Sequence, residues 1–266
     1  MKKVIFSLSP RSAVHGPRKS FFCFNYGRWT IVCGLFFLIG CATTQVSLKT
    51  QEARLMDSAE EALVGRSMAE NIIKKGCPPV PDAARQLFIN KIGQRIAQVC
   101  DRRDIVYHFM ILDSPDRNAF ALPGGYIYVY DGLIKKLSEP ELAALLAHEV
   151  AHVTLKHPLK KMQAALGEDL LLGLAFVGLG QKDPVFDEEI AKVRPEVFAL
   201  LGRGYDVDEE EAADRLALRY LRRTNYDPSL LAQVLKILNS GPGRVFETAS
   251  SRARMDGRIR KVLKGN

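Results

Sequence analysis

Residues 147–152 constrain this chain more than any other stretch, because they read Ala-His-Glu-Val-Ala-His and so contain the pattern His-Glu-x-x-His. The residues just before them, 141–146, are mostly strong helix formers, which places the pattern within a predicted helix. Residues four apart on a helix point the same way, so His148 and His152 could bind one Zn²⁺. Glu149 would then lie beside the ion without binding it, placed to act as a general base on a water molecule.

The alternative is a helix that carries two incidental histidines. The chain has only five histidines among 266 residues, so this spacing seldom arises by chance. Ala147, Val150 and Ala151 make the segment largely apolar, and two imidazoles and a carboxylate are costly to bury there without partners. The sequence therefore favours a metal site.

The composition is that of a globular protein with a sizeable core, with 47% hydrophobic and 26% charged residues. The formal net charge of +8 is concentrated near the start, where residues 1–40 contain six basic and no acidic side chains. Because the rest of the chain is close to neutral, the charge gives no argument for a nucleic-acid partner.

The N-terminal region has the pattern of a bacterial export signal. Arg28 precedes an apolar run over residues 31–39, which ends in Leu-Ile-Gly-Cys at Cys41 and resembles a lipobox. Nine apolar residues are too few for the ~20 that span a bilayer, which disfavours an uncleaved membrane helix. We predict a lipoprotein signal peptide over 1–40, lipidation at Cys41, a tether over 41–52 and one domain over 53–266. The protein would lie in the periplasm, anchored to the cell envelope, with the outer membrane favoured.

Cys77 and Cys100 are the only cysteines after Cys41. An even pair in an oxidising compartment predicts a disulfide between them, joining the two ends of a helical segment, rather than two free thiols.

Periodicity and end signals predict the remaining elements. Helices are expected over 53–75, over 82–99 with Leu87, Phe88, Ile92 and Ile96 inward, from the Ser138 capping box to before Pro158, from about 208, and over 229–238. Strands are expected over 105–112 and 126–130. The apolar run over 170–179 is too short to span a bilayer and predicts a buried helix or a lid, with contact to a membrane surface less favoured.

The segment 118–125 is expected at the edge of a sheet. Pro123 cannot donate to a strand ladder, and Gly124 and Gly125 allow another backbone to approach closely. An extended peptide could add to such an edge as a further strand. An ordinary hairpin with a Gly-Gly corner explains the same residues equally well.

A metal held by two histidines needs a third protein ligand. His157 does not fit the metzincin pattern, since Leu155 and Pro158 stand where that pattern has Gly and His, and it is expected to be a surface residue at a helix end. Glu210 and Asp214 are four apart in an acidic cluster, so one could bind the metal and the other orient an imidazole. Acidic residues also suit a helix N-terminus on dipole grounds, so spacing alone leaves Glu210 open.

Four motifs in this order resemble the HtpX and CAAX-prenyl-protease type of zinc metalloendopeptidase, and more closely its exported bacterial branch without transmembrane helices. They are Asn-Ala-Phe-Ala-Leu-Pro-Gly-Gly-Tyr-Ile-Tyr from Asn118, His-Glu-Val-Ala-His from His148, Glu-x-x-Ala-Asp from Glu210, and Tyr-Asp-Pro from Tyr226. The resemblance covers about residues 53–259.

The resemblance implies a mainly helical, zincin-like α+β domain with a small antiparallel sheet whose edge strand flanks the active-site helix. It implies that Glu210 is the third zinc ligand and that Asp214 supports a ligand histidine. It makes the 118–125 edge the expected substrate-binding strand, with Asn118, Ala119, Phe120, Ala121, Gly124 and Gly125 as its residues.

The chain departs from the family pattern at two places. Tyr205 is followed by Asp206 and Val207 where relatives often have Ser-Arg, and Ser-Arg-Ala around Arg252 replaces a Thr-His-Pro found in many members. The second departure leaves an oxyanion-stabilising or gating role unassigned, and Arg252 is a candidate for it.

The function expected is that of a zinc-dependent endopeptidase with one Zn²⁺ per chain, acting on unfolded or misassembled exported proteins of the bacterial envelope. Two other classes remain open. One is a chaperone-like envelope assembly factor with a latent protease site covered by residues 157–205. The other is a structural lipoprotein that binds no metal.

Overall fold

The computed structural model describes residues 56–75, 77–180, 204–240 and 249–265. The expected signal peptide, the lipidation at Cys41 and the tether lie outside the described residues. Among the helices that are described, none combines the length and the apolar character needed to cross a membrane.

Three strands form a small mixed sheet in the order β1-β3-β2. β3 (Tyr126–Tyr130) runs parallel to β1 (His108–Leu112) and antiparallel to β2 (Ala119–Ala121). The α+β class is confirmed, but the prediction of an antiparallel sheet is wrong for the β1–β3 pair. The 3₁₀ turn at Pro123–Gly125 folds β2 back onto β3 as a hairpin, so β1 takes the remaining edge of β3.

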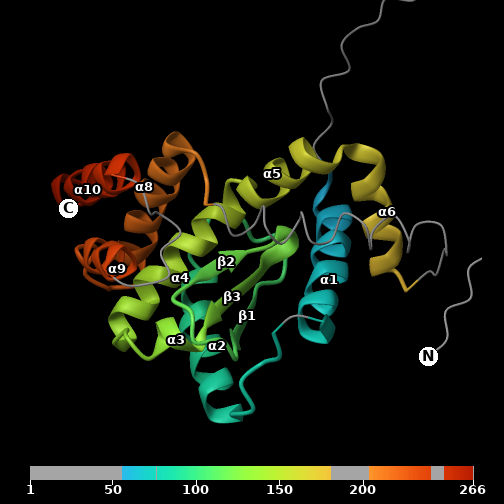
Figure 1. The fold of residues 1–266 in the computed structure, drawn as a ribbon, viewed down its shortest axis with the longest axis horizontal. Helices are drawn as coiled ribbons and strands as arrows, with labels where there is room; N and C mark the ends of the chain where they lie inside the picture. The colour runs from blue at the N-terminus through green and yellow to red at the C-terminus, as the bar shows by residue number, and fades with distance from the viewer. Residues whose placement is uncertain (1–55, 76, 181–203, 241–248, 266) are drawn as a thin grey trace, which may run out of the picture. The chain divides into compact units, whose positions relative to one another are not determined.

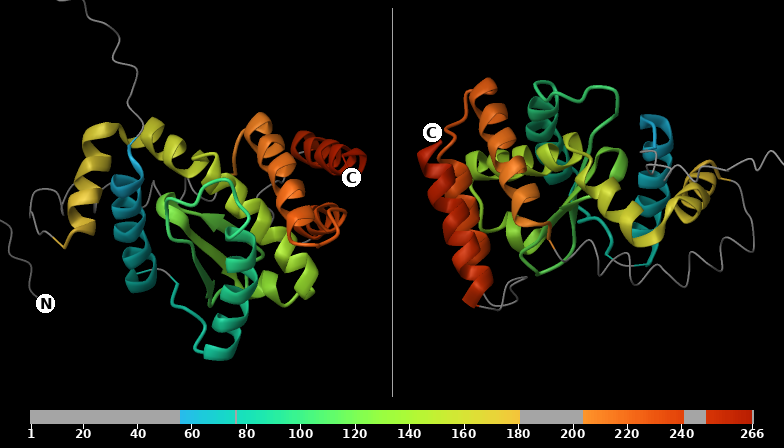
Figure 2. Two further views of the ribbon diagram at one scale, coloured as in Figure 1. Left: turned by 180° about the vertical axis from the view of Figure 1, so that it is seen from behind. Right: turned by 90° about the horizontal axis from the view of Figure 1, so that it is seen from above.

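Helices surround this sheet (Figure 1). They are α1 (Ser58–Lys75), α2 (Ala83–Ala97), α3 (Asp131–Ile134), α4 (Glu139–Thr154), α5 (His157–Leu166), α6 (Glu168–Gly178), α8 (Val207–Arg223), α9 (Leu230–Asn239) and α10 (Ala249–Lys264). The helices α8, α9 and α10 gather on one side of α4, while α1 and α6 lie on the other side of the sheet (Figures 1 and 2). The sequence did not predict α3, α5 or α10.

The core has two parts that meet at the sheet. Ile127 and Val129 of β3 pack with α2, α4, α8, α9 and α10, whereas Tyr128 packs with α1, α5 and α6. This is the alternation expected of a strand that is buried on both faces. α4 is buried without a break from Leu142 to Val153, and its first turn has the predicted Ser138–Glu141 capping box. The helix that carries the His-Glu-x-x-His pattern is therefore the central element of the fold.

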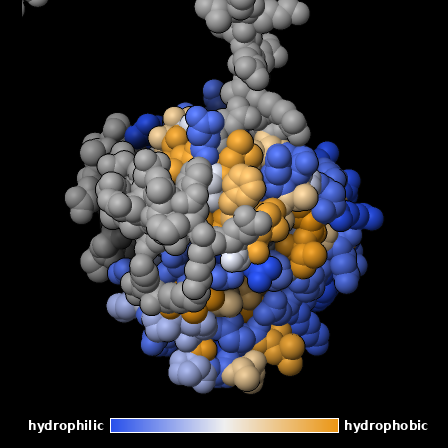
Figure 3. Space-filling model, turned by 90° about the vertical axis from the view of Figure 1, so that its right-hand side faces the viewer, coloured by the Kyte–Doolittle hydropathy of each residue, from blue (hydrophilic) through white to orange (hydrophobic). Residues whose placement is uncertain are grey.

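The apolar segment near residue 170 is the helix α6, which packs against α1. Leu171, Leu174 and Ala175 are buried, so the buried-helix interpretation is correct for that face. Phe176 and Leu179 are exposed, and apolar side chains gather on this side of the molecule (Figure 3).

The outer edge of β1 is covered by amide side chains of α2. Gln86 both donates to and accepts from Ile111, Asn90 donates to the Phe109 carbonyl, and Gln94 donates to the Tyr107 carbonyl, over 2.8–3.1 Å. These three residues recur every four positions, so they share one helix face. They satisfy backbone groups that a further strand would otherwise pair with.

The same rotation of α2 corrects one sequence expectation. Ile89, Ile92, Gly93 and Ile96 face the core, whereas Leu87 is 71% and Phe88 43% exposed. At about 100° per residue, Leu87 lies opposite the centre of the buried face. The prediction that Leu87 and Phe88 point inward is therefore wrong.

The predicted Cys77–Cys100 disulfide is contradicted, because both cysteines are free thiols. Cys77 precedes α2 and donates to the Asp113 carbonyl, while Cys100 follows α2 and donates to the Arg102 carbonyl. A straight helix of this length spans about 22 Å at 1.5 Å per residue. Disulfide-linked Cα atoms lie only about 4.4–6.8 Å apart, so the intact helix keeps the two thiols from meeting.

A buried ion pair fixes α1 to the rest of the domain. Arg102 donates to both carboxylate oxygens of Glu61, over 2.9 and 2.6 Å, and to the Val153 carbonyl at the end of α4. Glu61 also accepts from the Gly124 N–H over 3.0 Å. One pair of charges thus joins α1, the end of α4 and the turn between β2 and β3.

Two helical glycines make a matched test of this packing. A Cβ added at Gly93 would lie 2.5 Å from the ring of Phe109, which is only 2% exposed, whereas the nearest atom to a Cβ at Gly257 is 4.0 Å away. We expect Gly93→Ala to lower the free energy of unfolding by about 1–3 kcal/mol through overpacking. Gly257→Ala should raise it by about 0.5–1 kcal/mol. Urea unfolding measures both, and equal stability of the two variants would contradict this packing of Gly93 against Phe109.

Candidate metal centre

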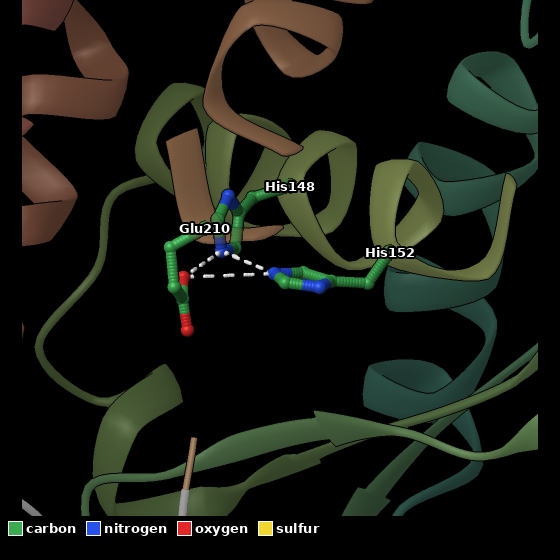
Figure 4. Close-up of side chains that lie close together, drawn as sticks. All are labelled: His148, His152 and Glu210. Atoms are coloured by element: carbon green, nitrogen blue, oxygen red, sulfur yellow. Dashed lines mark hydrogen bonds and ion pairs between the residues drawn. The ribbon is translucent and has the colours of Figure 1, made fainter. Parts of the chain in front are cut away.

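The candidate site lies where α4 packs against the start of α8 (Figure 4). His148 and His152 come from successive turns of α4, and Glu210 comes from the first turn of α8. The two imidazole Nε2 atoms are 3.0 Å apart. The Glu210 Oε2 atom lies 3.4 Å from the Nε2 atom of His148 and 3.6 Å from the Nε2 atom of His152. Three ligand atoms from positions 148, 152 and 210 thus form one small triangle.

The size of this triangle fits a tetrahedral metal ion. With metal–ligand bonds of about 2.0–2.1 Å, the ligand atoms of a tetrahedral site lie about 3.3 Å apart. The three observed separations, from 3.0 to 3.6 Å, bracket that value. All three residues are 9% exposed or less, and their three ligand atoms face one another. The residues present therefore fit a metal ion bound by two imidazoles and one carboxylate.

The local sequence sets the position of Glu210. Asp206 and Glu209 form a capping box that starts α8, so Glu210 falls in the first turn and faces α4. The Tyr205 N–H donates to the Glu210 Oε1 atom over 3.2 Å, which leaves the Oε2 atom directed at the histidines. The acidic cluster noted in the sequence therefore does both things: it caps the helix and supplies a candidate ligand.

Asp214 lies one turn after Glu210 and supports the other side of His148. Its Oδ1 atom is 3.1 Å from the His148 Nδ1 atom. Arg258 of α10 donates to both Asp214 oxygens over 2.9 and 2.8 Å, and its Nη1 atom lies 2.9 Å from the Glu210 Oε2 atom. One guanidinium group thus compensates two buried carboxylates.

His152 is enclosed by two residues that sequence reasoning did not place at the site. Its Nδ1 atom lies 2.9 Å from the Nδ1 atom of His157, and the Tyr205 ring stacks on the imidazole with centroids 4.1 Å apart. The expectation that His157 is a surface residue is wrong, because it is only 5% exposed. The chain turns sharply at Lys156, where φ is 57°, and this turn brings the His157 ring against the ring of His152.

Burial and neighbouring charges shift the titration of the site. Burial raises the pKa of Glu149 to about 7, against the opposing effect of His148. A carboxyl group with a pKa near neutrality can both accept and release a proton. Burial acts to raise the pKa of Glu210, but His148 and His152 hold it well below its usual range. Burial likewise opposes protonation of His148, yet Asp214 and Glu210 raise its pKa to about 10. Burial lowers the pKa of His152 to about 3.

The other predicted site residues lie near this centre to different degrees. The strand with Ala119, Phe120 and Ala121 is a sheet edge and lies next to α4. Gly124 and Gly125 are buried, and a Cβ on either would lie within 2.6 Å of backbone atoms of Ala62 or Val106, so their small size serves packing. The side chain of Arg252 lies outside the described residues.

The sequence did not place Arg258, Tyr205 or His157 at this centre, and only the first two left a weak signal. Arg258 stands in an Arg-Ile pair near the chain end, and Tyr205 stands in a Gly-Tyr pair just before α8. His157 lies five residues after His152, and on a straight helix residues with this spacing point in different directions, so the contact between their rings could not be predicted.

Comparison with known proteins identifies the class to which this fold and site belong. Residues 83–263 match peptidase family M48, so the chain belongs to that family.

The chain is 24% identical over 209 residues to the beta-barrel assembly-enhancing protease of Escherichia coli K12, a match that covers 74% of this chain and 41% of that protein. It is 26% identical to the mitochondrial metalloendopeptidase OMA1 of Schizosaccharomyces pombe, over 66% of this chain and 51% of the relative. It is 29% identical to the metalloprotease LoiP of Escherichia coli, over 47% of this chain and 48% of the relative. The matched region therefore spans about half or less of each of these relatives.

Arg258 offers a test of the buried charges around the site. Replacing it by Met leaves two ionised carboxylates without their cation, and breaking a buried ion pair in this way costs about 3–5 kcal/mol. We expect Arg258→Met to lower the free energy of unfolding of the metal-free protein by that amount in a urea titration. Arg260→Met, an exposed arginine on the same helix, should change it by less than about 0.5 kcal/mol. A similar small effect for both variants would show that Arg258 does not compensate these charges.

Proposed function

We propose that the protein is a zinc-dependent endopeptidase of the bacterial cell envelope that hydrolyses unfolded or misassembled exported proteins. The observation that carries this proposal is the triangle formed by the His148, His152 and Glu210 ligand atoms, with Glu149 buried beside it. Two imidazoles and one carboxylate that leave a fourth position open are a donor set typical of catalytic zinc. The names of the relatives agree with peptide-bond hydrolysis as the reaction.

The catalytic roles follow from the chemistry of each group. A zinc ion in this triangle would supply a Lewis acid that polarises the scissile carbonyl and lowers the pKa of the attacking water. Glu149 takes the proton of that water and passes it to the leaving amine. Asp214 and Arg258 hold His148 and Glu210 in place, so these two residues need not rearrange to bind the ion.

Substrate would bind as an added strand on β2. The β2–β3 hydrogen bonds pair Tyr130 with Asn118 and Leu122 with Tyr126, so alternate residues, Ala119 and Ala121, direct their N–H and C=O groups away from β3. Ala119 is only partly buried, whereas Ala121 is 1% exposed. Since α2 covers the opposite edge at β1, β2 is the edge of the described sheet that favours a peptide. Pairing through backbone atoms implies loose sequence choice, which suits unfolded polypeptides.

The cellular setting is part of the same proposal. A lipobox ending at Cys41 supports an acyl anchor, and so a place on the periplasmic side of an envelope membrane, with the outer membrane favoured. The E. coli relative's name, which refers to β-barrel assembly, supports envelope proteins as the substrate class.

A glutamate variant tests the assigned base. Glu149→Gln keeps the size of the side chain but cannot accept the proton, so we expect it to keep one zinc per chain and to lose about 10²–10⁴-fold in the rate of casein cleavage. Zinc content by elemental analysis and the rate of peptide release measure the two quantities.

Glu139→Gln is the matched control, because Glu139 is exposed on the first turn of the same helix. This variant should cleave casein at the wild-type rate. Wild-type cleavage by Glu149→Gln would remove the assigned base. A wild-type protein that holds no zinc would overturn the metallopeptidase proposal itself and leave the chaperone-like or structural alternatives.

A further inference from the structure

The two candidate ligand histidines do not have the same kind of support. His148 has a carboxylate, that of Asp214, 3.1 Å from its Nδ1 atom. His152 has no carboxylate in that place, and its Nδ1 atom instead lies 2.9 Å from the Nδ1 atom of His157. A ligand imidazole commonly donates its second N–H to a carboxylate or a carbonyl. A second histidine, His157, in the place of that acceptor therefore needs its own explanation.

The positions of the protons follow from the geometry. If the Nε2 atom of His152 is to offer its lone pair to a metal, the ring proton must be on its Nδ1 atom. The hydrogen bond to His157 then runs in one direction, with His152 donating and the His157 Nδ1 atom accepting. His157 must carry its own proton on Nε2. The pair therefore fixes both tautomers at once.

A break in the helix makes this contact possible. On a continuous α-helix, residues five apart point about 140° away from each other, so His157 could not reach His152. α4 instead ends at Thr154, and Lys156 takes a left-handed conformation with φ 57° and ψ 26° before α5 begins at His157. This conformation costs about 1–2 kcal/mol for a residue other than glycine. Here it aligns the His157 Nδ1 atom with that of His152.

The surroundings hold the pair in this arrangement. His157 is 5% and His152 1% exposed, so bulk water does not compete for the hydrogen bond. The Tyr205 ring stacks on His152, with ring centroids 4.1 Å apart, and lies 5.6 Å from the ring of His157. His157 is not itself a member of the ligand triangle, which is formed by positions 148, 152 and 210.

We propose that His157 is a positioning residue that accepts the Nδ1 proton of His152 and so fixes His152 as an Nε2 ligand. This role rests on the proposed zinc site and adds to it the requirement for a hydrogen-bond acceptor under the second histidine. The kink at Lys156 is the structural device that supplies the acceptor.

Three substitutions separate the acceptor from the ring. His157→Phe keeps an aromatic ring of similar size and removes the acceptor, and His157→Ala removes both. His157→Asn keeps an acceptor, because the Asn Oδ1 atom stands on the same γ carbon as the His Nδ1 atom. His108→Phe is the matched control, since His108 is an exposed histidine of β1 that stacks on Tyr126.

The measurement is the zinc dissociation constant, by competition with a chromogenic chelator, together with the visible spectrum of the cobalt-substituted protein. Losing a supporting partner of a metal ligand typically costs 10–100-fold in affinity. We expect that loss for His157→Phe and His157→Ala, with an altered cobalt spectrum. We expect affinity within about threefold of wild type for His157→Asn and His108→Phe. Thermal unfolding of each metal-free variant shows that it is folded.

Two results would overturn the role of His157. One is wild-type zinc affinity and an unchanged cobalt spectrum in His157→Phe. The other is a loss in His157→Asn as large as that in His157→Phe, which would assign the effect to the ring and not to the acceptor. Failure of the wild-type protein to bind zinc is a separate result, which contradicts the proposed function itself.

Discussion

The packing of α4 against α8 is the contact on which the rest of the structure depends, because it brings buried charges of both signs together. Glu210 and Asp214 are both lowered in pKa, so two negative charges lie on one face of α8. Charges this deeply buried persist only when they are compensated. Arg258 contacts both carboxylates, and His148, whose pKa Asp214 and Glu210 raise to about 10 against the effect of burial, supplies a second positive charge in the metal-free protein. The site is thus electrically balanced before any ion binds, at the cost of bringing a third helix, α10, into contact with it.

Short-range patterns in the sequence were sufficient for the two histidines of the ligand triangle, but not for its third member or for most of its support. His148 and His152 follow from helix periodicity, and their burial follows from the apolar residues between them. Glu210 needed the family resemblance, because spacing alone cannot distinguish a ligand from a residue that favours a helix N-terminus. Arg258 and His157 depend on contacts that form only after folding: one comes from a helix 44 residues beyond its partner Asp214, and the other from a kink. Likewise, the parallel β1–β3 pair and the separated cysteines depend on how elements meet, which no local pattern encodes.

The two edges of the sheet differ in how they are covered, and the difference bears on the proposed binding of substrate. A free edge invites pairing with any extended chain, which is a hazard for a protein whose proposed substrates are unfolded polypeptides. Gln86, Asn90 and Gln94 occupy the β1 edge with side-chain amides that imitate a neighbouring strand. β2 has no such cover from α2, and it is the edge that lies beside the His-Glu-x-x-His helix. Covering one edge would direct strand addition to the place where the attacking group is located.

The backbone at Lys156 shows how strain and function are linked in this fold. A left-handed residue other than glycine is unfavourable, so it persists only where the surrounding contacts determine it. The Lys156 side chain donates to the Met56 carbonyl and lies 3.8 Å from Glu61, which also accepts from Arg102 and Gly124. The same buried ion pair that fixes α1 therefore also helps to hold the kink in place. The kink in turn positions His157, and His157 contacts His152. The helix α1 and the candidate metal centre are therefore connected by an unbroken series of contacts.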